Sequence, residues 1–495
     1  MKHQHRSVRW KVILAALAFL IAAAGCTHER DSRSKEEAKM KGVLRSTVEA
    51  RLPAIEAAFL SSPEKNENRR EFADILYKVG RMRQANDVIA PLAGTAAATV
   101  DDVWLGARLA YVLGEYRKAE ELFGRLKDIA PPGSGAGSAA REGLILTYYQ
   151  TNRYQKARDL KPSKTDRKSR DDGSLVAFMK RFSDAPYRIR WASAEKVARL
   201  PIVNDFTPAG ALPIVRLNVN GQPVEFILDT GGDRLYIDEQ VARRIGIRTI
   251  TTRQAKYAYT EGKTVKEPLG VAESVEMGAV TLENVPVIVA KWKALGLTTD
   301  GVLTTQILRQ FLTTVDYDRK EIIFRERSEK GRQEMLASFE GDPVRLPFWL
   351  ASTHLMFTRG SINGRTMSLF VDSGLAMSMP LVVTDEAVED LGLSDRKTNV
   401  EGSPYYWVPV GSYGMDGLQS GASQALGHVF VEEDPYWGLG FLADALISHQ
   451  YLRHLGSWTI DFDTMSYCFP ADAAELAKQS AGLHQAPQRP AGNSD

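Results

Sequence analysis

The stretch FILDTGGD, residues 226–233, places an aspartate at the end of an apolar, β-prone run. The stretch LFVDSG, residues 369–374, repeats this arrangement. An aspartate at the end of an apolar strand is costly to bury unless it is hydrogen-bonded or lies at a cleft. Because the arrangement occurs twice, the sequence predicts one site built from two copies of a unit, with Asp229 and Asp372 at its centre.

The surroundings of the two aspartates also repeat. Each aspartate follows an Asn-Gly pair by nine residues, from Asn220 and from Asn363, and Asn-Gly between apolar runs predicts a tight hairpin. A short amphipathic helix is expected after each motif, at residues 236–245 and 383–391. Further along, Leu308 and Leu452 follow their aspartates by 79 and 80 residues and precede similar closing strands. Two matching features in each half are far more specific than two tripeptides.

This pattern resembles the bacterial aspartyl protease family, whose members are retropepsin-like. The resemblance rests on the apolar strand ending in Asp-Thr-Gly, the helix, the distal leucine segment and the closing strand. It implies two lobes on one chain, at residues 185–335 and 336–472, arranged as a mainly-β pseudo-two-fold pair. The implied activity is that of an aspartic endopeptidase acting on a peptide or protein substrate.

Such a site needs two carboxyl groups that share one proton, because two like charges so close cannot both be ionised. The charged carboxyl activates a water molecule, and the protonated one polarises the scissile carbonyl. Asp229 and Asp372 are the predicted catalytic pair, and the sequence does not assign base and acid between them.

Four neighbouring residues are predicted to support the pair. Gly231 and Gly374 carry no Cβ, so their backbone amides can approach the carboxylates. The resemblance implies that the hydroxyl groups of Thr230 and Ser373 bridge the two lobes beneath the pair. In an alternative interpretation, the two motifs are Asx turns that never meet.

Several positions depart from the family pattern. Thr304 and Ser448 stand where the family usually has a glycine, and Gly232 and Leu375 replace its usual alanine or serine. A side chain at Thr304 or Ser448 is expected to crowd the aspartates. The alternative function is therefore a catalytically inactive relative that serves as a peptide- or protein-binding scaffold in the cell envelope. Residues 257–264 are a candidate flap over the cleft, and residues 411–427 are either a second flap or a mobile loop.

The N-terminus has the pattern of a targeting segment. A basic start leads into the apolar run 12–24, which is too short to span a bilayer and is typical of a signal peptide. The sequence AAAGC at residues 22–26 resembles the lipobox of bacterial lipoproteins, whereas the alternative is a plain secretory signal in which the cysteine is incidental. We therefore expect a signal peptide at 1–25, lipidation of Cys26, a tether at 26–45, and a chain anchored in the bacterial envelope on its periplasmic or extracytoplasmic face.

A helical domain is predicted at residues 46–165. The sequence GRMRQA at 80–85 recurs 34 residues later as GEYRKA at 114–119, and more loosely as NRYQKA at 152–157. This spacing resembles tetratricopeptide repeats. The region either binds a peptide or partner protein in a groove, or serves as a spacer between the membrane and the lobes.

The remaining segments and the composition limit other interpretations. Residues 166–184 are expected to be a charged linker, and residues 473–495 a disordered tail. A formal net charge of +2 argues against nucleic-acid binding. The eight histidines show no zinc signature, so neither a metal nor another cofactor is expected. Cys468 is expected to be reduced and buried.

Overall fold

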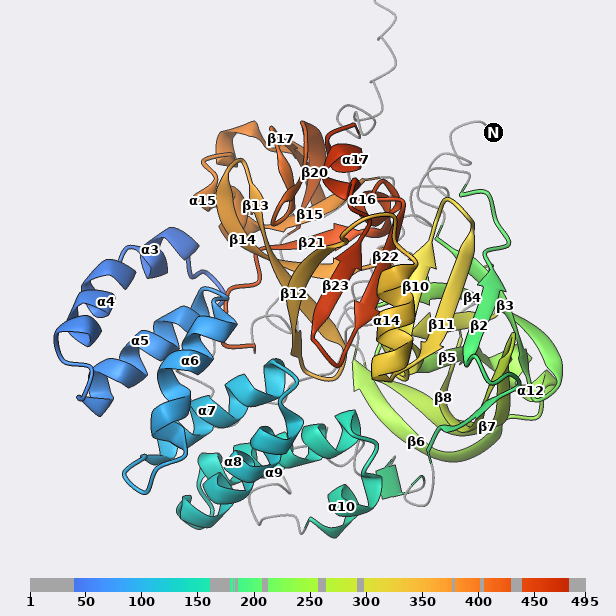
Figure 1. Cartoon of the computed structure of the whole chain (residues 1–495), viewed down its shortest axis with the longest axis horizontal. Coiled ribbons are helices and arrows are strands. Elements are labelled where there is room, and N and C mark those ends of the chain that lie inside the picture. Colours follow the sequence, from blue (N-terminus) through green and yellow to red (C-terminus); the bar gives the residue numbers. More distant parts are fainter. Residues whose placement is uncertain are drawn as a thin grey trace, which may run out of the picture.

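The computed structural model describes residues 40–160, 179–180, 182, 186–206, 212–256, 264–291, 298–375, 379–400, 405–428 and 439–479. The predicted signal peptide, Cys26 and most of the predicted charged linker lie outside these residues. Within the described ranges, no helix is long and apolar enough to cross a membrane. The chain folds into an N-terminal helical region followed by a mainly-β region (Figure 1).

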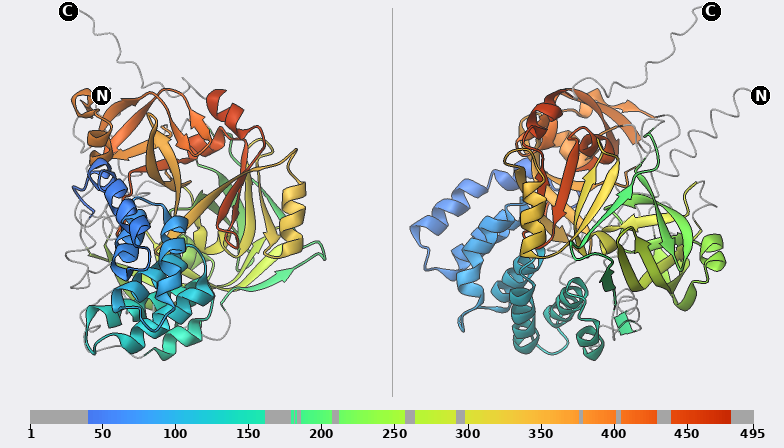
Figure 2. Two further views of the ribbon diagram at one scale, coloured as in Figure 1. Left: turned by 60° about the vertical axis from the view of Figure 1, so that its left-hand side comes forward. Right: turned by 45° about the vertical axis from the view of Figure 1, so that its right-hand side comes forward.

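The helical region forms a curved row along one side of the β region (Figures 1 and 2). Its turns explain the repeated glycine, because Gly80, Gly114 and Asn152 adopt φ of 79°, 76° and 55°, which favours glycine or asparagine. The helices are α3 (Arg45–Glu49), α4 (Leu52–Ser61), α5 (Asn66–Lys78), α6 (Met82–Ala93), α7 (Val100–Val112), α8 (Tyr116–Ile129), α9 (Gly135–Gln150) and α10 (Tyr154–Asp159).

The helical region packs directly onto the β region. Met40 and Arg45, which fall in the predicted tether, are buried. Leu442 donates its backbone N–H to the carbonyl oxygen of Lys78, and the hydroxyl of Tyr77 donates to the carbonyl of Leu439 at 2.9 Å. The end of the predicted tether therefore packs with the folded chain, since Arg45 pairs with Asp444 of the second half.

The first half of the β region contains a closed barrel. Its strands follow the order β8-β5-β9-β4-β3-β7, and a further pairing of β7 with β8 closes the ring, with β1 and β6 attached. Alternating or continuous apolar residues are buried along the six strands that form the closed ring. The strands are β1 (Arg188–Trp191), β3 (Ile214–Val219), β4 (Gln222–Asp229), β5 (Leu235–Asp238), β6 (Arg248–Lys256), β7 (Thr264–Met277), β8 (Val280–Ala290) and β9 (Gly301–Thr304).

The second half repeats the central connections of the first. The hairpin of β3 and β4 corresponds to that of β13 and β14, and both predicted Asn-Gly turns are confirmed by positive φ at Asn220 and Asn363. The strands of this half are β13 (Leu355–Ile362), β14 (Arg365–Asp372), β15 (Leu381–Thr384), β16 (Thr398–Asn399), β17 (Tyr405–Val410), β18 (Tyr413–Met415), β19 (Leu418–Ser420), β20 (Ser423–His428) and β21 (Ala445–Ser448).

A central sheet joins the two halves. Its strands follow the order β12-β23-β22-β10-β11-β2, so β10 of the first half pairs with β22 of the second. Helix α14 (Glu329–Ala337) is part of the connection between the halves and lies beside these strands (Figure 1). The strands are β2 (Val197–Pro201), β10 (Phe311–Asp316), β11 (Glu321–Glu326), β12 (Val344–Ala351), β22 (Ser457–Asp461) and β23 (Ser466–Phe469).

The structure corrects three local predictions. The helices expected at 236–245 and 383–391 are shorter, as α12 (Glu239–Arg244) and α15 (Asp385–Asp390), because their first residues complete the buried strands β5 and β15. Residues 411–427 form β18, β19 and part of β20 instead of a flap, whereas the tip at 257–263 lies outside the described residues. The predicted disordered tail begins with α17 (Ala473–Gln479), which buries Ala473 and Ala477.

Candidate functional site

The two motif aspartates lie at equivalent strand ends. Asp229 is the last residue of β4 and is paired in register with Thr304 of the parallel strand β9. Asp372 is the last residue of β14 and is paired with Ser448 of the parallel strand β21. Both aspartates are fully buried, at 0% exposure. The buried apolar strands therefore carry two ionisable groups into the interior.

The residues after the aspartates join the two halves. The N–H of Thr230 donates to the Ser373 hydroxyl at 3.0 Å, and the N–H of Ser373 donates to the Thr230 hydroxyl at 2.9 Å. The Thr230 hydroxyl in turn donates to the carbonyl of Val371 at 3.0 Å. These reciprocal bonds fix the two strand ends against each other.

The glycines bring each carboxyl group against the opposite half. A Cβ added to Gly374 would lie 2.2 Å from Cγ of Asp229, and one added to Gly231 would lie 2.7 Å from Oδ1 of Asp372. A real side chain at either position would displace a carboxyl group. The structure thus brings together all six site residues that the sequence predicts in the two motifs, whereas Cys26 lies outside the described residues.

Hydrogen bonds orient the carboxyl groups. Gly231 donates its N–H to Oδ1 of Asp229 at 2.7 Å, and Gly374 donates to Oδ1 of Asp372 at 2.9 Å. The Oδ2 atoms of both aspartates are buried and have no hydrogen-bond partner among the described residues. The Oδ1 atoms are therefore fixed by backbone amides, and the Oδ2 atoms are left to bind a water or a proton.

Burial raises the pKa of both carboxyl groups. It raises the pKa of Asp229 to about 6, although the N–H of Gly231 partly opposes the shift. Burial, followed by the charge of Asp229, raises the pKa of Asp372 well above 3.8. Because two negative charges so close together repel each other, the pair keeps one proton and one charge over a range of pH above its first ionisation.

The two residues that replace the family glycine are accommodated differently. A Cβ added to Gly232 would lie 2.5 Å from Cγ2 of Thr304, so the absence of a side chain at Gly232 leaves room for the threonine. The Ser448 hydroxyl donates to the carbonyl of Met379 at 2.8 Å and accepts the N–H of Gln450 at 3.1 Å. Crowding is thus relieved by a smaller neighbour in one half and by a hydrogen-bonded rotamer in the other.

Two residues that form hydrogen bonds with the segment after Asp229 were not predicted from the sequence. The Thr305 hydroxyl donates to the carbonyl of Thr230 at 2.7 Å, and Oε1 of Gln306 accepts the N–H of Leu235 at 3.2 Å. Both lie on the short helix α13 (Thr305–Leu308). No local pattern marks them, although their place directly after the β9 segment could have suggested contact with β4.

The described residues contain no group of three or more histidine, cysteine, aspartate or glutamate residues that could hold a metal ion. Residues 215–307 match the aspartyl protease family. The matched segment runs from β3 to α13 and includes Asp229, Thr230 and Gly231. The match supports an aspartyl protease family for this chain and, at that level, a peptidase-like function.

Solved structures are also similar to parts of the chain. A retropepsin-like aspartic protease from Rickettsia conorii is 17% identical, with 29% of this chain and 95% of that chain covered and a TM-score of 0.20. Basic 7S globulin from soybean is 13% identical, with 57% and 98% covered and a TM-score of 0.35. Conglutin gamma from lupine seeds is 10% identical, with 57% and 99% covered and a TM-score of 0.34. The comparison with curated proteins gave no match.

Proposed function

We propose that this chain is an aspartic endopeptidase in which Asp229 and Asp372 form one catalytic pair. The observation that carries the proposal is the reciprocal bonding of Thr230 and Ser373, which brings the two strand ends together. The contact of each carboxyl group with the glycine of the opposite half supports it further.

The pair belongs, in this proposal, to two lobes related by a pseudo-two-fold axis. In such an arrangement, equivalent residues meet where the axis passes. Thr230 and Ser373 do so at the site. Thr314 and Thr459, which hold the same place in the two closing strands, are paired in register, and their hydroxyl oxygens are 2.7 Å apart. Two pairs of equivalent residues, each in contact at a different place in the structure, support a common axis.

One proton and one charge on the pair define two roles. The charged carboxyl acts as general base on a water held between the two Oδ2 atoms, taking its proton as the water oxygen attacks the scissile carbonyl carbon. The neutral carboxyl donates a hydrogen bond to the carbonyl oxygen and stabilises the developing charge. The proton taken by the pair is then delivered to the leaving amine as the C–N bond breaks, so the pair returns to its starting charge.

The accommodation of Thr304 and Ser448 supports activity over the inactive scaffold. Gly232 provides space for Thr304, and the Ser448 hydroxyl is bound to Met379 and Gln450.

We include in the proposal a lipid anchor at Cys26 in the cell envelope. A Cys26→Ser variant should then move from the membrane fraction to the soluble fraction.

We also include in the proposal that α5 to α8 are degenerate tetratricopeptide-like repeats. Helices α5 and α7 begin 34 residues apart, at Asn66 and Val100, and α6 and α8 begin at the same spacing, at Met82 and Tyr116. This period supports a repeated helix pair.

The test is cleavage of casein and a peptide library by the full-length protein in detergent, across acid to neutral pH. Asp229→Asn and Asp372→Asn should each abolish cleavage, and the double variant should lose no more than either, since the pair acts as a unit. The exposed Asp395→Asn is the matched control and should keep full activity. Cleavage that survives either site change would overturn the shared pair, and an inactive wild type would favour the scaffold.

A further inference from the structure

Helix α9 contacts the loop that follows Asp229, here called the motif loop (residues 230–234). The hydroxyl of Tyr149, a buried residue in the last turn of α9, donates to the backbone carbonyl of Asp233 at 3.2 Å. The Asp233 carboxylate in turn pairs with Arg234 at 3.0 Å and accepts the Tyr236 hydroxyl at 2.7 Å. The helical region thus reaches a residue four positions from Asp229.

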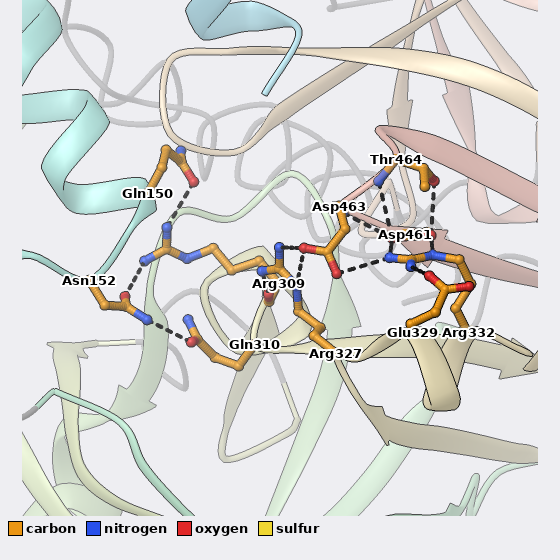
Figure 3. Close-up of polar contacts among 10 residues, drawn as sticks. All are labelled: Gln150, Asn152, Arg309, Gln310, Arg327, Glu329, Arg332, Asp461, Asp463 and Thr464. Carbon is orange, nitrogen blue, oxygen red and sulfur yellow. Dashed lines mark hydrogen bonds and ion pairs between the residues drawn. The ribbon is translucent and has the colours of Figure 1, made fainter. Parts of the chain in front are cut away.

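A second connection runs through Arg309, which directly follows α13. The Arg309 guanidinium lies 4.4 Å from the ring centroid of Tyr149, close enough for a cation–π interaction. It donates to Oε1 of Gln150 at 2.8 Å and to Oδ1 of Asn152 at 3.3 Å, and Asn152 donates to Gln310 at 2.9 Å (Figure 3). Residues at the end of α9 and just after it therefore bind Arg309 and Gln310, which directly follow α13.

Helix α13 transmits this contact to the motif loop. Its Thr305 hydroxyl binds the carbonyl of Thr230, and its Gln306 binds the N–H of Leu235. The two connections from α9, one direct and one through α13, converge on both ends of the motif loop. Gly231 and Gly232 give this loop high intrinsic freedom, so its geometry must be fixed by contacts from outside.

The polar contacts continue into the second half. Arg327 donates to the carbonyl of Arg309 at 2.5 Å and pairs with Asp463. Arg332 of α14 pairs with Asp463 at 3.1 Å and with Asp461 at 2.7 Å (Figure 3). The contact between α9 and α13 is therefore held from the second half as well.

We propose that α9 is a positioning element of the site, with Tyr149 and Arg309 as positioning residues for the motif loop. The helical region then contributes to the geometry of the site. This role differs from the peptide-binding groove and the membrane spacer that the sequence suggests. The kinetic part of this inference rests on the proposed function, whereas the structural part does not. A displacement of about 1 Å at a catalytic group can cost about 100-fold in rate, so weak contacts of this kind affect activity before stability.

The experiment compares Tyr149→Phe with Tyr148→Phe in the full-length protein. Tyr148 is the adjacent tyrosine, whose ring lies 5.2 Å from the guanidinium of Arg153 within the helical region. Hydrogen exchange is followed by mass spectrometry on a peptide covering residues 229–236. We expect faster exchange in Tyr149→Phe and wild-type exchange in Tyr148→Phe. Equal exchange in wild type and Tyr149→Phe would overturn the inference, whether or not the protein cleaves peptides.

The kinetic measurement follows in the active protein. Tyr149→Phe should lower kcat about 10-fold with KM nearly unchanged, because it disturbs the geometry of the pair and not the binding surface. Arg309→Lys keeps the charge but loses the fork that reaches two acceptors, and should lower kcat in the same way. Unchanged kcat in both variants would contradict the positioning role. An inactive wild type would contradict only the proposed function, since the exchange comparison still decides the inference.

Discussion

The two halves of the β region present nearly the same strand ends to the site, yet each is supported in its own way. In the first half, the motif loop is held by α9 and α13, and Gly232 makes room for Thr304. In the second half, the Ser448 hydroxyl forms two bonds of its own. A shared site therefore requires equal geometry only at the strand ends, while the supporting contacts are free to differ.

The difference is clearest at the start of β9 and β21. Asp300 and Asp444 precede these strands and have the same backbone role, since each carboxylate accepts an N–H, from Glu225 at 3.3 Å and from Ser368 at 2.7 Å. Asp444 also accepts a buried arginine, Arg45 of α3, at 2.5 Å. The helical region thus contacts the first half beside the motif loop and the second half at the opposite end of its strands.

Arg45→Met should have the largest effect on stability. It leaves Asp444 buried without its cationic partner, which costs about 3–5 kcal/mol. Urea unfolding of the two proteins measures this loss. Arg45→Met combined with Asp444→Asn should recover most of it, and equal losses in the single and double variants would show that the charge pair is not what holds α3 to the second half.

Asp372→Asn should stabilise the protein in a pH-dependent way. The folded-state pKa of Asp372 lies well above 3.8, so the folded carboxyl keeps a proton that the unfolded one loses, and stability falls as pH rises above about 4. Over the range in which only the folded carboxyl keeps its proton, the wild type loses up to about 1.4 kcal/mol for each pH unit.

Thermal melts of the wild type and Asp372→Asn from pH 4 to 7 measure this effect. The advantage of the variant should vanish near pH 4 and grow with pH. A constant difference would contradict the raised pKa.

Gly232→Ala should be destabilising by about 1–3 kcal/mol, because its Cβ would overlap Cγ2 of Thr304. Thr304→Gly removes that methyl group, so the double variant should be more stable than the sum of the single changes predicts. A double-mutant cycle on unfolding free energies measures the coupling. Strict additivity would show that the two residues do not compensate for each other.

The smallest expected effect on stability is the difference between removing the Ser448 hydroxyl and removing the Thr304 hydroxyl. Ser448→Ala removes the side chain that accepts the N–H of Gln450 at the start of α16 (His449–Arg453) and should cost about 1 kcal/mol. The Thr304 hydroxyl is buried without a hydrogen-bond partner among the described residues, so Thr304→Val should be neutral or slightly stabilising. Unfolding midpoints that rank the variants in the opposite order would contradict this difference between the halves.

The sequence predicts the local features of the site well. Asn220 and Asn363 mark the hairpins, and the apolar runs before Asp229 and Asp372 form buried strands, because turn chemistry and hydrophobic pattern act over a few residues. The strand β5 was missed because a short buried run such as Tyr236-Ile237 has no periodicity that separates strand from helix.

Contacts between distant segments could not be predicted. Arg45 and Asp444 are 399 residues apart, and neither sits in a pattern that names its partner. From the sequence, Thr304 is expected to crowd the aspartates. Its fit depends on the space left by Gly232, and this contact is set by the packing of β9 against the motif loop. The position of α9 beside Asp233 likewise follows from how the helical region docks, which single-sequence patterns do not encode.

The pH dependence of kcat/KM for the wild type decides whether Asp229 and Asp372 share one proton as a catalytic pair. We expect a bell-shaped profile that rises through about pH 6 as the pair loses its first proton and falls at higher pH as it loses the second. Activity that is highest near pH 3 and already lost by pH 6 would contradict it.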